Sequence, residues 1–121
     1  MRLLSNLICD ESDGPRHVPF TAGGSTSVNA DTTTGKISYN PTFFVFGQFS
    51  RFIRPVAKRI PCTSNSDDFI ATAALNPDGV ITVVVQNLRD HEIFFRVWRN
   101  GKSLRYTSPA NAVMTFNFQP K

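Results

Sequence analysis

Few side chains in this sequence have the chemistry of a catalytic pair, and their positions do not bring them together. Glu11 and Glu92 are the only glutamates among the 121 residues, and they belong to different predicted elements. Two carboxylates that act as acid and base on one bond must flank it at about 5–9.5 Å. Because nothing in their spacing forces these two into that arrangement, we expect both to be solvated carboxylates.

The other titratable side chains also lack the arrangement of a catalytic site. Asp67 and Asp68 are neighbours at the start of a predicted strand, so their side chains point to opposite faces. His17 has no Cys or Ser at a suggestive spacing, and His91 beside Asp90 is typical of a turn. The sequence contains no phosphate-binding loop, nucleophile elbow or zinc motif. We therefore predict no catalytic residue, no metal site and no cofactor for this chain.

Charge and cysteine content narrow the classes of partner. The chain has 13 Lys and Arg and 9 Asp and Glu, a net charge of +4. The cations are spread without a run of five, so we expect a solvated surface and no nucleic-acid partner. Cys9 and Cys62 match no metal or redox motif, which favours two buried thiols and leaves their pairing open. No apolar run approaches the ~20 residues of a transmembrane segment, and the start of the chain is a poor signal peptide.

The first part of the chain is predicted to contain a strand, a long loop and a helix. The apolar residues of 3–9 indicate a short buried strand, residues 10–36 a loop, and residues 36–39 a short extended piece. Asn40 is placed to cap a helix whose first residue is Pro41. Pro55 is expected to end this helix.

The predicted helix is amphipathic. Its apolar positions recur at helical spacing and form a stripe of Val45, Phe46, Phe49, Phe52 and Ile53. We expect Arg51 and Arg54 in the last turn, where cations complement the negative end of the helix. A face that carries Phe46, Phe49 and Phe52 is an apolar patch unless something covers it.

After Pro55 the hydrophobic period changes from helical to two. Asn76–Gly79 is a turn signal, and Asn100–Gly101 is a hairpin signal that requires positive φ twice. The fold class is therefore mainly β, an antiparallel β-sandwich of about six strands. The predicted strands cover residues 57–60, 68–76, 80–87, 91–98, 103–107 and 111–118.

Three aromatic residues of this sandwich could form a binding platform. Phe94 and Trp98 share one face of a predicted strand, opposite Phe95, and Tyr106 lies on the next strand. Such a platform would suit a carbohydrate or a protein partner. Ordinary packing of these rings in an interface is the alternative, and we favour it because aromatic side chains readily fill interfaces.

Four segments in order resemble the glucosylceramidase-like enzymes of glycoside hydrolase family 30. Residues 39–55 are similar to the family segment YNPxYYxxGHFSKFIRPGA, and residues 6–15 to WNLxLxxxGGPN. Residues 68–87 are similar to the hairpin DLxAxAxxxPDGxxVVVVLN, and residues 108–118 to the closing strand SPxxSIxTxxW. The resemblance covers nearly the whole chain, although Ser5, Asp13, His17 and Val56 replace the usual Trp, Gly, aromatic residue and Gly.

The resemblance implies an architecture of a (β/α)8 barrel that carries the active site, with a β-sandwich beside it. Residues 1–55 would be the end of the barrel, with its eighth strand at 3–9 and its last helix at 41–53. Residues 56–121 would be the C-terminal part of the sandwich. The family's two catalytic glutamates lie on the fourth and seventh barrel strands and have no counterpart here. The resemblance thus implies a non-catalytic C-terminal fragment of a retaining β-glycosidase.

Further expectations about site and partners follow from this resemblance. The loop after the last strand lines the mouth of a barrel, which would make Arg16, His17 and Phe20 the substrate-proximal residues. The family implies a role in sphingolipid metabolism, glucosylceramide or a related β-glycoside as substrate, and a lysosomal or secreted location. The Phe46/Phe49/Phe52 face would be covered by the barrel domain, by the sandwich or by self-association. The alternative is a stand-alone β-sandwich module that binds a carbohydrate, a glycolipid or a protein.

Overall fold

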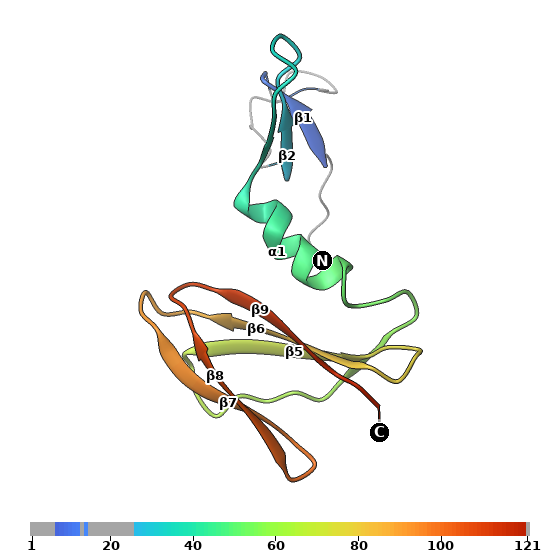
Figure 1. The fold of residues 1–121 in the computed structure, drawn as a ribbon, viewed down its shortest axis with the longest axis vertical. Helices are drawn as coiled ribbons and strands as arrows, with labels where there is room; N and C mark the ends of the chain where they lie inside the picture. The colour runs from blue at the N-terminus through green and yellow to red at the C-terminus, as the bar shows by residue number, and fades with distance from the viewer. Residues whose placement is uncertain (1–6, 13, 15–25, 121) are drawn as a thin grey trace. The chain divides into compact units, whose positions relative to one another are not determined.

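The computed structural model describes residues 7–12, 14 and 26–120 (Figure 1). The chain divides into two compact units, Met1–Gly47 and Gln48–Lys121, and each is described by itself. Arg16, His17 and Phe20, predicted to lie near a substrate, are outside the described residues, as is the first part of the strand predicted at 3–9.

The first unit contains a small three-stranded sheet. Strand β1 (Ile8–Asp10) pairs in parallel with β2 (Val28–Ala30), and β2 pairs antiparallel with β3 (Ile37–Tyr39). The extended piece at 36–39 is confirmed. The prediction of an unbroken loop over 10–36 was wrong, because it contains β2. With three residues, β2 is shorter than the ~4–8 residues of alternation that indicate a strand.

Helix α1 (Pro41–Ser50) begins where the sequence predicted. The side-chain amide of Asn40 donates to the Thr26 carbonyl at 2.9 Å, so this group links the helix to residue 26. Apolar side chains are not confined to one face of α1, since Phe43, Phe44, Val45 and Phe46 are consecutive and all exposed. No residue of α1 is buried.

The helix ends at Ser50, so Arg51 and Arg54 lie beyond its last turn, contrary to expectation. In a longer helix, the Phe52 carbonyl and the Arg54 amide would form hydrogen bonds within the helix. Here both groups form hydrogen bonds with the sandwich. The Phe52 carbonyl accepts a hydrogen bond from the Asn76 side-chain nitrogen at 2.9 Å. The Arg54 amide donates to the side-chain oxygen of Asn76 at 3.0 Å.

The second unit is the predicted antiparallel β-sandwich with six strands, and the mainly β fold class is confirmed (Figure 1). One sheet has the order β4-β5-β6-β9 and the other pairs β7 with β8. The strands are β4 (Lys58–Ile60), β5 (Phe69–Leu75), β6 (Ile81–Asn87), β7 (Ile93–Arg99), β8 (Lys102–Ser108) and β9 (Val113–Phe118).

Apolar side chains from both sheets form the core of the sandwich. Ala73, Val83 and Val85 are buried at its centre. Phe95 of β7 joins the two sheets, with its ring centroid 4.9 Å from that of Phe69 and 5.9 Å from that of Phe116. Strand β6 is central between β5 and β9, and four consecutive residues, Thr82–Val85, are buried.

The opposite face of the four-stranded sheet holds residues 48–54. Thr115 alternates with the core residue Phe116, and its hydroxyl donates to the Gln48 side-chain oxygen at 2.7 Å. Both predicted turns are present, with φ of 83° at Gly79, 46° at Asn100 and 76° at Gly101. Within the described part of the chain, no helix has the length and apolar character needed to cross a membrane.

Candidate functional site

The two glutamates do not have the environment of an acid–base pair. Glu11 is exposed, and its carboxylate accepts hydrogen bonds from the Thr32 amide at 2.9 Å and the Thr32 hydroxyl at 2.8 Å. The Thr32 amide is the largest cause that lowers the pKa of Glu11. A carboxylate held in its ionised form is a poor general acid. Glu92 is exposed just before β7, in the other unit.

The remaining titratable groups are also arranged as structural residues. His91 lies in a turn with its Nδ1 3.1 Å from the Asp90 carboxylate, and this contact lowers the pKa of Asp90. Cys9 is buried, Cys62 is half-buried, and both are free thiols. Burial raises the pKa of Cys62, so this thiol is a weak nucleophile. No cluster of three His, Cys, Asp or Glu side chains suited to a metal ion exists among the described residues.

Exposed side chains that could contact a ligand gather on the hairpin of β7 and β8. Burial alternates along β7, so that Phe94 and Trp98 are 56% and 69% exposed while Phe95 packs in the core. The register of the hairpin pairs Arg96 with Arg105. It also places Thr107 beside Phe94 and Ser103 beside Trp98. We call the surface formed by these residues the outer hairpin face: Phe94, Arg96, Trp98, Ser103, Arg105 and Thr107.

Tyr106 does not belong to this face. It is the cross-strand partner of Phe95, and its ring centroid lies 5.3 Å from that of Phe116 on the facing sheet. Of the three rings predicted to form a platform, Phe94 and Trp98 therefore share this face and Tyr106 does not. The sequence could have predicted this position of Tyr106. The turn at Asn100–Gly101 sets the register of the hairpin, and this register makes residue 106 the cross-strand partner of residue 95.

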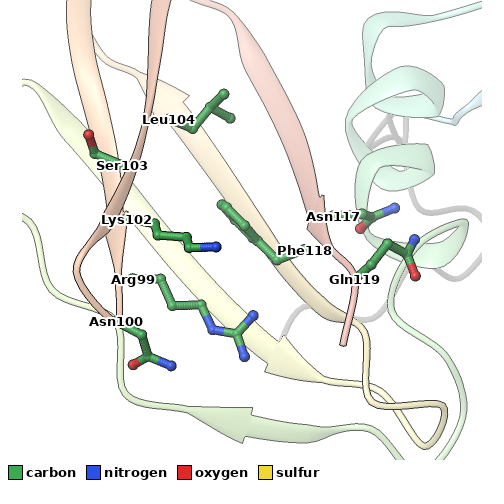
Figure 2. A pocket seen from close by; sticks show the side chains of 8 residues that line it. All are labelled: Arg99, Asn100, Lys102, Ser103, Leu104, Asn117, Phe118 and Gln119. Atoms are coloured by element: carbon green, nitrogen blue, oxygen red, sulfur yellow. The ribbon is translucent and has the colours of Figure 1, made fainter. Parts of the chain in front are cut away.

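A cavity of about 560 Å³, which the sequence did not reveal, lies between the tip of the hairpin and the end of β9. Figure 2 shows the side chains of Arg99 and Lys102 extending from the hairpin toward Phe118. The cavity has apolar surface from Leu104 and Phe118 and cations on one side. Asn100, Ser103, Asn117 and Gln119 complete its lining.

The class of protein that this fold defines is a two-sheet β-sandwich linked to a preceding helix. Residues 57–116 match the family model described as the glycosyl hydrolase family 30 beta sandwich domain. The sandwich segment is therefore similar to the β-sandwich domain of glycosyl hydrolase family 30.

Curated relatives support this assignment. The chain is 27% identical over 110 residues to the endo-1,6-beta-D-glucanase BGN16.3 of Trichoderma harzianum, with 86% of this chain and 22% of the relative covered. It is 27% identical over 112 residues to the endo-1,6-beta-D-glucanase neg1 of Aspergillus fumigatus, with the same coverage of 86% and 22%. The chain thus spans about a fifth of the length of these relatives.

Solved structures share the fold over nearly the whole chain. SrfJ from Salmonella typhimurium superposes with a TM-score of 0.88 at 23% identity, covering 95% of this chain and 25% of SrfJ. The endo-beta1,6-glucanase BT3312 superposes with a TM-score of 0.79 at 21% identity, covering 95% of this chain and 26% of that enzyme. The match to the family's sandwich domain and the curated relatives support the family-level part of the resemblance. Both curated relatives are named for β-1,6-glucan, and neither is named for glucosylceramide.

Proposed function

We propose that this chain forms the non-catalytic C-terminal part of a family 30 β-glycosidase. The match of residues 57–116 to the family's sandwich domain carries this proposal. The environments of Glu11 and His91 support it, because neither side chain is placed as a general acid or base. Residues 1–55 would then be the end of the barrel and residues 56–121 the sandwich.

The sandwich would act by fixing the last helix of the barrel. Gln48, Phe52 and Arg54 follow one another through the end of α1 and the turn after it. Each is hydrogen-bonded to the four-stranded sheet or to Asn76 in the turn between β5 and β6. Asn76, which makes two of these bonds, is buried, so the link is shielded from water. A catalytic barrel needs its strands and loops held to within about half an ångström, and a helix that is anchored at its end contributes to that precision.

The substrate of the whole protein would be a β-linked glucan. The names of both curated relatives favour β-1,6-glucan as that substrate. Glucosylceramide is the second candidate, and the similarity of residues 39–55 to the glucosylceramidase-like segment supports it. Under either substrate, the loop with Arg16, His17 and Phe20 would lie closest to the sugar.

A chimeric enzyme tests the scaffold role. The C-terminal segment of the T. harzianum glucanase that matches this chain is replaced by residues 1–121, and hydrolysis of β-1,6-glucan is measured. We expect the chimera to be soluble and active, and the same glucanase without any C-terminal segment to be inactive. A chimera that is no better than the truncated enzyme would contradict the proposal.

The exposed rings of Phe94 and Trp98 favour a second candidate function, a module that binds carbohydrate without cleaving it. This candidate predicts that the isolated chain is retained on insoluble β-1,6-glucan and that Trp98→Ala abolishes the retention. Absence of retention for the unmodified chain would eliminate a neutral-glucan module.

A further inference from the structure

The positive charge of this chain is concentrated at its C-terminal end. Residues 93–121 contain no Asp or Glu and five of the 13 cations, whereas residues 1–92 contain eight cations and nine acids. The last two strands before β9 hold four of those five cations: Arg96, Arg99, Lys102 and Arg105. The hairpin therefore accounts for the net charge of +4.

Two of these cations lie directly opposite each other on the outer hairpin face. Arg96 and Arg105 are cross-strand partners, and like charges in that position destabilise a sheet. Neither forms an ion pair with any residue that the structure describes. The guanidinium of Arg96 lies 5.9 Å from the centroid of the Phe94 ring, a contact that positions it without neutralising its charge. An anion between the two guanidinium groups would remove their repulsion.

Uncovered aromatic rings flank this pair of cations. Phe94 and Trp98 are four residues apart on β7, which places them about 13 Å apart on the same face. Their cross-strand partners, Thr107 and Ser103, are small, so much of each ring remains exposed. The negative face of an aromatic ring attracts the weakly positive C–H groups of a sugar ring.

The geometry points to an acidic polysaccharide as the ligand of the outer hairpin face. Sugar rings would stack on Trp98 and Phe94, and the carboxylate or sulfate groups between them would pair with Arg96 and Arg105. A guanidinium suits this task because its planar fork binds both oxygens of a carboxylate. The choice of a glycan over other polyanions rests on the proposed function in a glycosidase.

The outer hairpin face remains accessible to a ligand while the four-stranded sheet contacts residues 48–54. The inner side of the hairpin packs through Phe95 on the four-stranded sheet, and Thr115 on the other side of that sheet bonds Gln48. Residues 48–54 and the outer hairpin face therefore lie on opposite sides of the sandwich. A glycan chain bound at the hairpin does not compete with the link to α1.

Binding of the purified 121-residue chain to four probes at one salt concentration tests this inference. The probes are polygalacturonate, neutral β-1,6-glucan, a poly(dT) oligonucleotide, and phosphatidylcholine vesicles that contain phosphatidylserine. We expect the tightest binding to polygalacturonate. The double variant Arg96→Gln/Arg105→Gln should bind it about tenfold more weakly, which corresponds to about 1.4 kcal/mol. Trp98→Ala should weaken binding about fivefold, and Trp98→Phe less than twofold.

The matched control removes two cations elsewhere in the sandwich. Lys58→Gln/Arg59→Gln on β4 changes the net charge by the same amount, and we expect less than a twofold effect. Equal losses in the two double variants, or no loss in either, would overturn the inference. Tighter binding to poly(dT) or to the vesicles would replace the glycan by a nucleic acid or a membrane. Because binding is measured without turnover, a failure here is distinct from a failure of the chimeric enzyme.

Discussion

The side-chain amide of Asn76 donates a hydrogen bond of 2.9 Å to the carbonyl of Phe52, which joins the turn after α1 to the sandwich. Asn76 also receives a hydrogen bond from the Arg54 amide at 3.0 Å, and its side-chain nitrogen lies 3.1 Å from the Thr82 hydroxyl. The Asn76 side chain itself is buried, with 5% of its surface exposed. One asparagine therefore fixes two backbone groups of the connecting segment.

Replacement of Asn76 by Ala should destabilise the chain substantially. It leaves the Arg54 amide without its partner and removes one of the two hydrogen bonds to the Phe52 carbonyl, which the Thr82 hydroxyl also contacts at 3.1 Å. An unsatisfied buried group costs about 1–3 kcal/mol. We expect a loss of about 1–3 kcal/mol in the free energy of unfolding, measured by urea denaturation. Asn65→Ala, at an exposed position, is the control and should change it by less than about 0.5 kcal/mol. Equal stability of the two variants would show that the link is unimportant.

Val56 has a left-handed backbone conformation that a β-branched residue rarely adopts. Its φ is 61° and its side chain is 84% exposed, so no packing compensates for the strain. Val56→Gly should stabilise the chain by about 0.5–1 kcal/mol, since the relief of strain exceeds the entropy that glycine loses on folding. Thermal unfolding measures this gain. Val80→Gly, where φ is not positive, should have the opposite sign, and a loss of stability in both variants would refute the explanation.

Asp68 is an ionised partner of Arg89 at the start of β5. The Arg89 side chain is the main cause that lowers the pKa of Asp68, and the Ser66 hydroxyl is the second. The pKa of Asp68 is therefore lower in the folded chain than in the unfolded chain. The pair stabilises the fold fully at pH values above the pKa of the unfolded state. This stabilisation is lost as the pH falls through the pKa of the folded state. Arg89→Gln should raise the pKa of Asp68 toward its ordinary value in a carboxyl NMR titration. Arg105→Gln should leave it unchanged, and an unaltered pKa in Arg89→Gln would contradict the pairing.

The apolar surface of α1 predicts self-association of the isolated chain. Phe44 is 60% exposed, and Phe46 and Phe49 are 39% and 38% exposed. Burial of these three side chains in an interface would contribute several kcal/mol of hydrophobic free energy, at ~25 cal/mol per Å². Light scattering should show dimers or larger species, and Phe46→Gln/Phe49→Gln should shift them toward monomer. Ile70→Gln, another exposed apolar position, is the control. A monomer that binds no hydrophobic dye would contradict this prediction.

The sandwich could be predicted from the sequence because the turn residues and the alternation of apolar and polar residues indicate the same strands. Gly79 and the Asn100–Gly101 pair fix where strands end, and the apolar residues of β9 then face the core. The end of α1 could not be predicted, because it depends on Asn76, more than twenty residues farther along the chain. The cavity beside Phe118 is equally a product of tertiary packing. The face of Tyr106, in contrast, follows from the register that the turn sets.

We propose that this chain is scaffold and has no glycosidase activity of its own. Hydrolysis of β-1,6-glucan and of an aryl β-glucoside by the purified 121-residue chain tests it most directly. We predict no turnover above that of buffer across pH 4–8, where a glycosidase acid–base pair would work at about pH 6. Turnover that copurifies with the chain and disappears in Glu11→Gln or Glu92→Gln would contradict the account.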